Sequence, residues 1–164
     1  MSDARPIYQT TDDLKEERRI ALRVVRRFKA VGVKLGEHEA LDACVLGTND
    51  WVMGWLECKG RKSYSYSQIA EMGGLMLSNN KWTVARDLVQ GAPDSKFWLG
   101  VSLKDGDYLL TVPHGSPQWL QRTYWRGRSD RNDTLDKEAV VLLPMDAFEK
   151  IGEAEAVKTE EPWI

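Results

Sequence analysis

The sequence has little of what marks a secreted or a membrane protein. It contains only two cysteines, Cys44 and Cys58, which is too few for the disulfide framework of a small secreted domain. No apolar run approaches the roughly 18 residues that a membrane-spanning helix needs. Residues 1–19 hold no apolar segment of the kind found in signal peptides. We therefore expect a protein of the reducing cytoplasm, with both cysteines as small core residues.

Further absences narrow the kinds of site that the chain can hold. Histidine occurs only at the isolated positions His38 and His114, and no Cys/His spacing matches a zinc site. No glycine-rich phosphate-binding loop is present. The formal net charge is −2, so the field of the whole molecule does not attract nucleic acid. Any nucleic-acid binding would therefore come from local basic surfaces.

The composition is that of an ordinary globular domain. Hydrophobic residues make up 42% and charged residues 29% of the 164 positions, a balance that suits one domain with a real core. We predict a single domain over residues 1–150 and an acidic, flexible tail over 151–164.

Hydrophobic periodicity and turn signals predict an alternation of helices and strands. The predicted helices cover residues 12–30, 65–82 and 145–151, with a loop signal within 83–96. The predicted strands cover residues 33–37, 40–46, 50–60, 96–103, 107–113 and 138–144. This order is typical of an α/β or α+β domain in which helices flank a mixed central sheet.

The predicted strand over 50–60 is apolar on both faces, yet it ends in two charges. Trp55, Glu57 and Lys59 alternate along one face. Burying a carboxylate and an ammonium costs several kcal/mol unless the two are paired or bind something. An acid-x-Lys triplet alone is weak evidence, because about one is expected by chance in a chain of this size. Only this triplet ends a strand of core character, although a simple Glu57–Lys59 ion pair would also explain it.

Two further acids point to the same place. Asp42 lies on the preceding strand of the predicted hairpin, and neighbouring strands run about 4.8 Å apart. Glu17 lies in line with the apolar stripe of the helix over 12–30, with Glu16 beside the stripe as the alternative. Clustered carboxylate oxygens suit magnesium or manganese. Lys59 would add a positive charge that orients a water or stabilises charge at a phosphate.

These residues resemble the PD-(D/E)XK nuclease superfamily over about residues 12–112. The resemblance lies in the order of a helix with Glu, a strand with Asp, a strand ending in "ECK" and a helix with Gln. Within this superfamily, the "ECK" at a strand end most resembles the Holliday-junction-resolvase-type members. One departure from the signature is Leu41, where the family name has proline.

The resemblance implies a restriction-endonuclease-like αβββαβ core and magnesium-dependent hydrolysis of phosphodiester bonds. By position, the catalytic residues would be Asp42, Glu57, Lys59, Glu17 and Gln68. The metal ligands would be Asp42, Glu57 and Glu17. Gln68 has a competing explanation, since Ser65 and Gln68 also form a helix-capping pattern.

Basic residues interleaved with aromatic ones predict a nucleic-acid surface. Arginines bind phosphates, and aromatic rings stack on unpaired bases. The segment over 119–131 contains Trp119, Tyr124 and Trp125 among its arginines, although such aromatic residues also occur in cores. The candidate nucleic-acid-binding residues are Arg19, Arg23, Arg26, Arg61, Lys62, Arg122, Arg126 and Arg128.

Three functions follow from these patterns. The first is a metal-dependent nuclease that acts on DNA rather than RNA, on branched or partly single-stranded substrates. The second is a binding module for nucleic acid or protein that keeps the nuclease fold without cleavage. The third is an unrelated α+β interaction protein, which would place Glu17 far from Glu57. The sequence leaves open whether the chain forms a homodimer.

Overall fold

The computed structural model describes residues 11–36, 38–126 and 137–154. Its helices are α1 (Thr11–Arg27), α2 (Tyr66–Glu71) and α3 (Asn79–Gly91). Its strands are β1 (Val31–Lys34), β2 (Ala43–Leu46), β3 (Val52–Arg61), β4 (Leu75–Ser78), β5 (Lys96–Leu103), β6 (Gly106–Pro113), β7 (Thr123–Arg126), β8 (Glu138–Leu143) and β9 (Glu149–Gly152). In the described part of the chain, no helix has the length and apolar character needed to cross a membrane.

A six-stranded sheet in the order β1-β2-β3-β5-β6-β9 forms the centre of the fold. Its strand pairs are antiparallel except for β3 and β5, which run parallel. A parallel pair needs a crossover, and α2, β4 and α3 supply it. The order α1, β1, β2, β3, α3, β5 confirms the predicted αβββαβ core and the mixed sheet.

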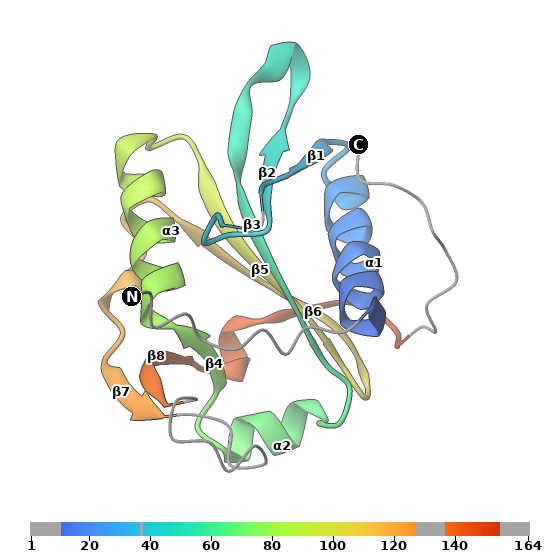
Figure 1. The fold of residues 1–164 in the computed structure, drawn as a ribbon, viewed down its shortest axis with the longest axis vertical. Coiled ribbons are helices and arrows are strands. Elements are labelled where there is room, and N and C mark those ends of the chain that lie inside the picture. Colours follow the sequence, from blue (N-terminus) through green and yellow to red (C-terminus); the bar gives the residue numbers. More distant parts are fainter. Residues whose placement is uncertain (1–10, 37, 127–136, 155–164) are drawn as a thin grey trace.

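Helix α1 covers one face of this sheet (Figure 1). Its buried residues Ile20, Ala21 and Val24 pack in one cluster with Leu56 of β3. Close approach is possible because Gly100 of β5 has no side chain: a Cβ there would lie 2.7 Å from Cγ2 of Ile20. This packing fixes the acidic first half of α1 against the sheet.

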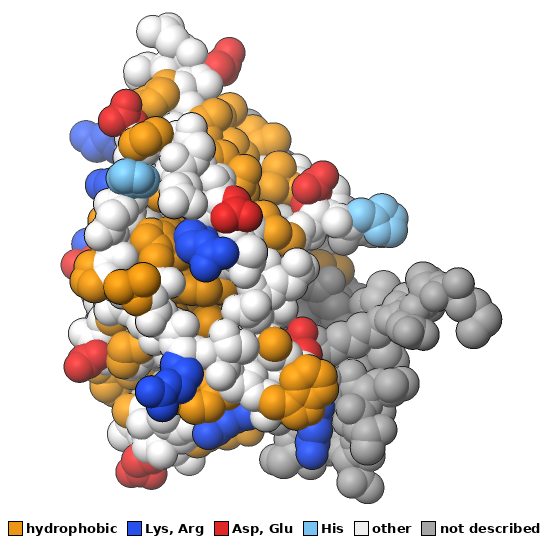
Figure 2. Space-filling model, turned by 90° about the vertical axis from the view of Figure 1, so that its left-hand side faces the viewer, with side chains coloured by type: hydrophobic (Ala, Val, Ile, Leu, Met, Phe, Trp, Pro, Cys, Tyr) orange, Lys and Arg blue, Asp and Glu red, His pale blue; other side chains and the backbone are white. Residues whose placement is uncertain are grey.

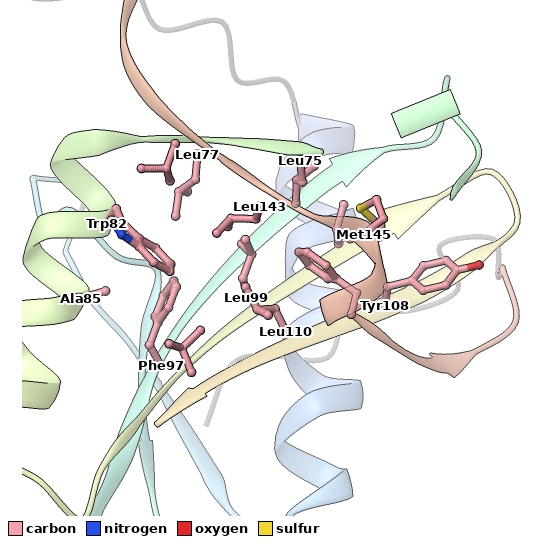
Figure 3. Packing of buried hydrophobic residues seen from close by; sticks show 14 of the residues in the cluster. Leu75, Leu77, Trp82, Ala85, Phe97, Leu99, Tyr108, Leu110, Leu143 and Met145 are labelled. Atoms are coloured by element: carbon pink, nitrogen blue, oxygen red, sulfur yellow. The ribbon is translucent and has the colours of Figure 1, made fainter. Parts of the chain in front are cut away.

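The opposite face carries α3 and a second sheet of three strands in the order β4-β8-β7. Figure 3 shows how these layers meet in one hydrophobic cluster. Its members include Leu75 and Leu77 of β4, Trp82 and Ala85 of α3, Phe97 and Leu99 of β5, and Leu143 of β8. Alternation along β3 therefore separates Trp55, packed on this cluster, from Leu56 on the α1 side.

The predicted helix over 65–82 is wrong. Helix α2 ends at Glu71, because Gly73 and Gly74 have φ angles of +97° and +125°, a region closed to most other residues. A Cβ on Gly74 would also lie 2.4 Å from the carbonyl oxygen of Leu143. The chain then forms β4 and α3, and the loop signal within 83–96 corresponds to the turn at residues 92–95, after α3 ends at Gly91.

The carboxyl-terminal prediction also needs correction. Residues 145–151 do not form a helix: a short 3-10 turn over Met145–Ala147 leads into β9. Strand β9 pairs with β6, so Ile151 and Gly152 belong to the sheet and not to a tail. Residues 155–164 of the predicted tail lie outside the described residues. The hairpin of β5 and β6 and the strand β8 agree with prediction.

Candidate active site

The site lies where β2 separates from β3. Their backbone pairing ends at Ala43 and Leu56. The amide of Asp42 still donates to the carbonyl of Leu56 at 3.1 Å, but the next backbone amide, that of Cys58, donates to Oδ2 of Asp42 at 2.7 Å. The side chain of Asp42 thus replaces a main-chain acceptor. This fixes its carboxylate beside β3, one residue from Glu57.

Glu57 is 2% exposed and lies in the centre of this site. Its Oε1 accepts a hydrogen bond from Nζ of Lys81, while its Oε2 has no hydrogen-bond partner among the described residues. Burial, followed by the repulsion of Asp42, raises the pKa of Glu57 to about 7, against the opposing charges of Lys81 and Lys59. Because Asp42 acts so directly on Glu57, the two carboxylates form a pair that a cation would neutralise.

Lys59 follows two residues later on the same face of β3. Burial, with the like charge of Arg61, lowers the pKa of Lys59 to about 8, and Glu57 and Asp42 partly offset these effects. A lysine with a pKa this near neutrality exchanges protons readily. Asp42, Glu57 and Lys59 therefore act on one another's charges in the structure, and their catalytic role stays a prediction.

Glu16 and Glu17 differ in the charges on which they act. The carboxylate of Glu16 is bound to Nζ of Lys62 at 2.8 Å and to the guanidinium of Arg19 at 3.1 Å. The charge of Glu17 instead acts on Lys81, the partner of Glu57. This effect is weaker than those of Glu57 and Asp42, and the role of Glu17 in the site stays a prediction.

Lys81 is the residue that sequence reasoning missed. It lies in the first turn of α3, inside a stretch that was predicted to end one helix and begin a loop. Burial disfavours its charged form, but Glu57, Asp42 and Glu17 outweigh this effect and raise its pKa. A lysine in the first turn of a helix opposes the helix dipole. That local mismatch was the available signal of an acidic partner elsewhere.

Gln68 has the structural role and not the catalytic one. Its side-chain oxygen accepts from the amide of Ser65 at 2.8 Å, and its own amide donates to Oγ of Ser65 at 3.3 Å. These two bonds close the capping box of α2, and Gln68 is exposed there. The predicted catalytic role of Gln68 is therefore not supported, and the polar residue that reaches Glu57 comes from α3.

Of the predicted nucleic-acid-binding arginines, Arg19 is buried and Arg23 is half-buried. Arg19 is 7% exposed and donates to both carboxylate oxygens of Asp107, at 2.7 and 2.9 Å. Arg23 also bonds Asp107, at 2.9 Å. The prediction that Arg19 binds phosphate is wrong, because this buried guanidinium neutralises the fully buried Asp107. Arg23 shares the bond to Asp107, and its contact with nucleic acid stays a prediction.

The other basic candidates of the first half of the chain lie nearer the surface. Arg26 is exposed on α1. Arg61 is half-buried and donates to the carbonyl of Gly60 at 2.7 Å. Lys62, with a side chain that is 37% exposed, pairs with Glu16. These residues remain predictions as nucleic-acid contacts.

The aromatic and basic segment around β7 divides into a buried and an exposed part. Trp119 is buried, with its ring 4.6 Å from that of Trp82, so it belongs to the core. Trp125 is 70% exposed, and Arg122 and Arg126 are exposed beside it. Arg128 lies outside the described residues. Figure 2 shows the face with α3 and the second sheet, where Lys and Arg side chains lie next to hydrophobic ones in the lower part.

A contact links this surface to the candidate site. Oγ1 of Thr123 in β7 lies 3.4 Å from Oδ1 of Asn79, at the start of α3. Lys81, which reaches Glu57, follows two residues after Asn79. Thr123 and Trp125 share a face of β7 because side chains alternate along a strand. Trp125 is therefore on the same face of β7 as the residue that contacts α3.

The residues present fit a hard divalent metal ion. Among the described residues, no three His, Cys, Asp or Glu side chains converge closely enough to hold one. Magnesium, however, is commonly bound by only one or two carboxylates, with water and substrate phosphates completing its shell. The buried Oε2 of Glu57 and the facing carboxylate of Asp42 offer such a pair of oxygen donors.

Comparison with known families agrees with this geometry. A family model described as "phage putative PDDEXK endonuclease" matches residues 3–151. The match spans α1, the fork of β2 and β3, and the crossover to β5. A search of curated proteins and a search of solved structures each found no match.

Proposed function

Because the chain belongs to this family of PDDEXK endonucleases, we propose that it is a metal-dependent nuclease that hydrolyses phosphodiester bonds in DNA. The observation that carries the proposal is the convergence of Asp42, Glu57 and Lys59 at the fork of β2 and β3. A buried carboxylate with a pKa of about 7 and a lysine with a pKa of about 8 are the perturbed groups expected at a catalytic site.

Each residue has a role that follows from its position. Asp42 and Glu57 would hold the metal ion through their oxygens, with Glu17 adding negative charge from α1. The bound ion supplies charge relief at the phosphate and lowers the pKa of a water molecule. Lys59 holds the attacking water and exchanges a proton at Nζ, because its pKa of about 8 leaves part of it neutral at neutral pH.

The finer choice of substrate rests on the surface around β7. Exposed Trp125 offers a stacking platform only to bases that are not already stacked in a duplex. Exposed Arg122 and Arg126 offer contacts to phosphates of either form. We therefore favour DNA that is branched or partly single-stranded. The free cysteines Cys44 and Cys58 suit a reducing compartment such as the cytoplasm.

A cleavage assay tests the proposed function. Purified protein is incubated with branched, single-stranded and duplex DNA, with Mg²⁺ or with EDTA. Wild type should cleave only with Mg²⁺, and Glu57→Gln and Lys59→Met should lose at least about a hundredfold in rate. Glu71→Gln, an exposed acid of α2, is the matched control and should keep full activity.

Two results would count against a nuclease. Cleavage that persists in Glu57→Gln would show that the activity belongs to another site or to a contaminant. DNA binding by wild type without any Mg²⁺-dependent cleavage would favour the alternative, a non-catalytic binding module on the same fold.

A further inference from the structure

The ammonium group of Lys81 lies at the point where the negative charges of the site meet. Its Nζ donates to Oε1 of Glu57, and Asp42 and Glu17 both act on its charge. The ammonium is thus bound to one buried carboxylate of β3, with further negative charge from Asp42 and, more weakly, from Glu17. A divalent metal ion would seek the same position, because that is where a positive charge is most favourable.

We propose that Lys81 occupies the cation position of the metal-free site and must leave Glu57 when a divalent metal ion binds. This inference rests on the proposed function, since it concerns the same site. Lys81 is then a positioning residue: it holds the Glu57 carboxylate in the metal-free protein and competes with the metal for it.

The surroundings of Lys81 allow such an exchange. Its side chain is 31% exposed, whereas that of Glu57 is 3% exposed, so the lysine can swing into solvent while the glutamate stays. Lys81 is in the first turn of α3, where the helix dipole disfavours a cation. Its ion pair with Glu57 holds it there, and a metal ion that neutralised this carboxylate would remove the reason for the contact.

The exchange also explains why the two carboxylate oxygens of Glu57 differ in their contacts. One oxygen is bound to Lys81, and the other is buried without a hydrogen-bond partner among the described residues. A buried carboxylate oxygen that is left unsatisfied costs free energy. Asp42 and Glu57 would hold a metal ion, Glu57 could offer it this oxygen, and Lys81 would then no longer be needed as the counter-charge.

A titration of the protein with Mn²⁺ in the absence of DNA, monitored by calorimetry, tests this competition. Lys81→Gln removes the charge but keeps a hydrogen-bond donor for Glu57. If Lys81 competes with the metal, this variant should bind Mn²⁺ about tenfold more tightly than wild type, within the usual range of coupling between two ligands. Lys81→Arg, which keeps the charge, should stay close to wild type.

Lys62→Met is the matched control. Lys62 is also a partly exposed lysine, 37% against 31% for Lys81, and it also pairs with a glutamate, Glu16. Loss of this charge should leave Mn²⁺ affinity unchanged if the effect is specific to the site. Equal increases in Mn²⁺ affinity for Lys81→Gln and Lys62→Met would show that the loss of any nearby positive charge has this effect. That result would overturn the inference.

A second measurement uses the wild-type protein and needs no variant to fold. Acetylation of lysines by a water-soluble reagent is followed by mass spectrometry, with EDTA or with saturating Mn²⁺. Lys81 should react several-fold faster with Mn²⁺, because its ammonium is then released from Glu57, while Lys62 should react at the same rate in both.

The possible results distinguish a failure of the Lys81–metal competition from a failure of the proposed nuclease function. Mn²⁺ that binds wild type and Lys81→Gln with equal affinity, with unchanged labelling of Lys81, refutes the competition and leaves the proposed nuclease standing. No Mn²⁺ binding by any variant refutes both. Tighter binding by Lys81→Gln alone, with faster labelling of Lys81 in wild type, supports the inference.

Discussion

Oδ2 of Asp42 accepts a hydrogen bond from the backbone amide of Cys58 at 2.7 Å. One carboxylate therefore has two tasks at the fork of β2 and β3. It closes the edge of β3 where the strand pairing stops, and it places a negative charge against Glu57. The candidate site is built into the sheet and not added on a loop, so its geometry depends on the same contacts as the fold.

Substitutions of Asp42 should separate these two tasks. Asp42→Asn keeps an acceptor oxygen for the Cys58 amide, whereas Asp42→Ala leaves a buried donor without a partner, at a cost of about 1–3 kcal/mol. We expect urea unfolding to show a larger loss of stability for the alanine variant. Both variants should lose Mg²⁺-dependent cleavage, because both lack the charge. Equal stability of the two would show that the bond to Cys58 contributes nothing.

Glu57→Gln should change how stability depends on pH in the absence of metal. Burial raises the pKa of Glu57 from 4.5 to about 7, so the folded protein binds this proton more tightly than the unfolded chain. The free energy of unfolding of wild type should therefore fall as pH rises from 4.5 to 7. Glu57→Gln lacks this loss and should be the more stable protein at pH 7, by at most about 3 kcal/mol.

Thermal unfolding between pH 4.5 and 7 in EDTA measures this difference, with Glu71→Gln as the control. The window stops at pH 7 because Lys59, with a lowered pKa of about 8, titrates above it. A stability difference between wild type and Glu57→Gln that is the same at both ends of the window would contradict the prediction.

Arg19→Met should damage the fold, not the DNA contacts. Its removal leaves the buried carboxylate of Asp107 with only part of its counter-charge, and breaking a buried ion pair costs about 3–5 kcal/mol. Arg26→Met, an exposed change on the same helix, should cost less than about 0.5 kcal/mol. Chemical unfolding of both variants tests this. Weaker DNA binding by Arg19→Met with unchanged stability would show that Arg19 reaches phosphate after all.

Trp125→Ala should weaken binding to single-stranded and branched DNA but not to plain duplex. Stacking on one exposed aromatic ring contributes about 1–3 kcal/mol per unpaired base. Trp51 is the control, because it is also exposed, at 53%, and is the residue immediately before β3. Trp51→Ala should leave both affinities unchanged. Binding is measured at fixed salt in EDTA, in the Glu57→Gln background, so that cleavage does not interfere.

The contrary outcomes are distinct. Equal losses for Trp125→Ala on duplex and single-stranded DNA would indicate a phosphate or packing effect in place of stacking. Equal effects of Trp125→Ala and Trp51→Ala would show that exposed aromatic residues bind DNA without regard to the site.

Local patterns predicted the strands better than the connections between them. The alternation in β3, the turn between β5 and β6 and the apolar stripe of α1 each depend on neighbours within a few residues, so the sequence alone identified them. The break at Gly73 and Gly74 depends on a carbonyl of β8, about 70 residues away along the chain. A helix over 65–82 was therefore a reasonable local prediction that a distant contact excludes.

The sequence by itself determined which residue types meet at the site: Asp42 and the Glu57–Lys59 pair stand on adjacent antiparallel strands, and strand spacing brings them together. Only the tertiary structure decided which other charges join them. The packing of α1 placed Glu16 in ion pairs with Arg19 and Lys62. The crossover to β5 brought Lys81 onto Glu57. A buried charge pairs with whatever opposite charge the fold places next to it, and that placement is set by long-range packing that no local pattern encodes.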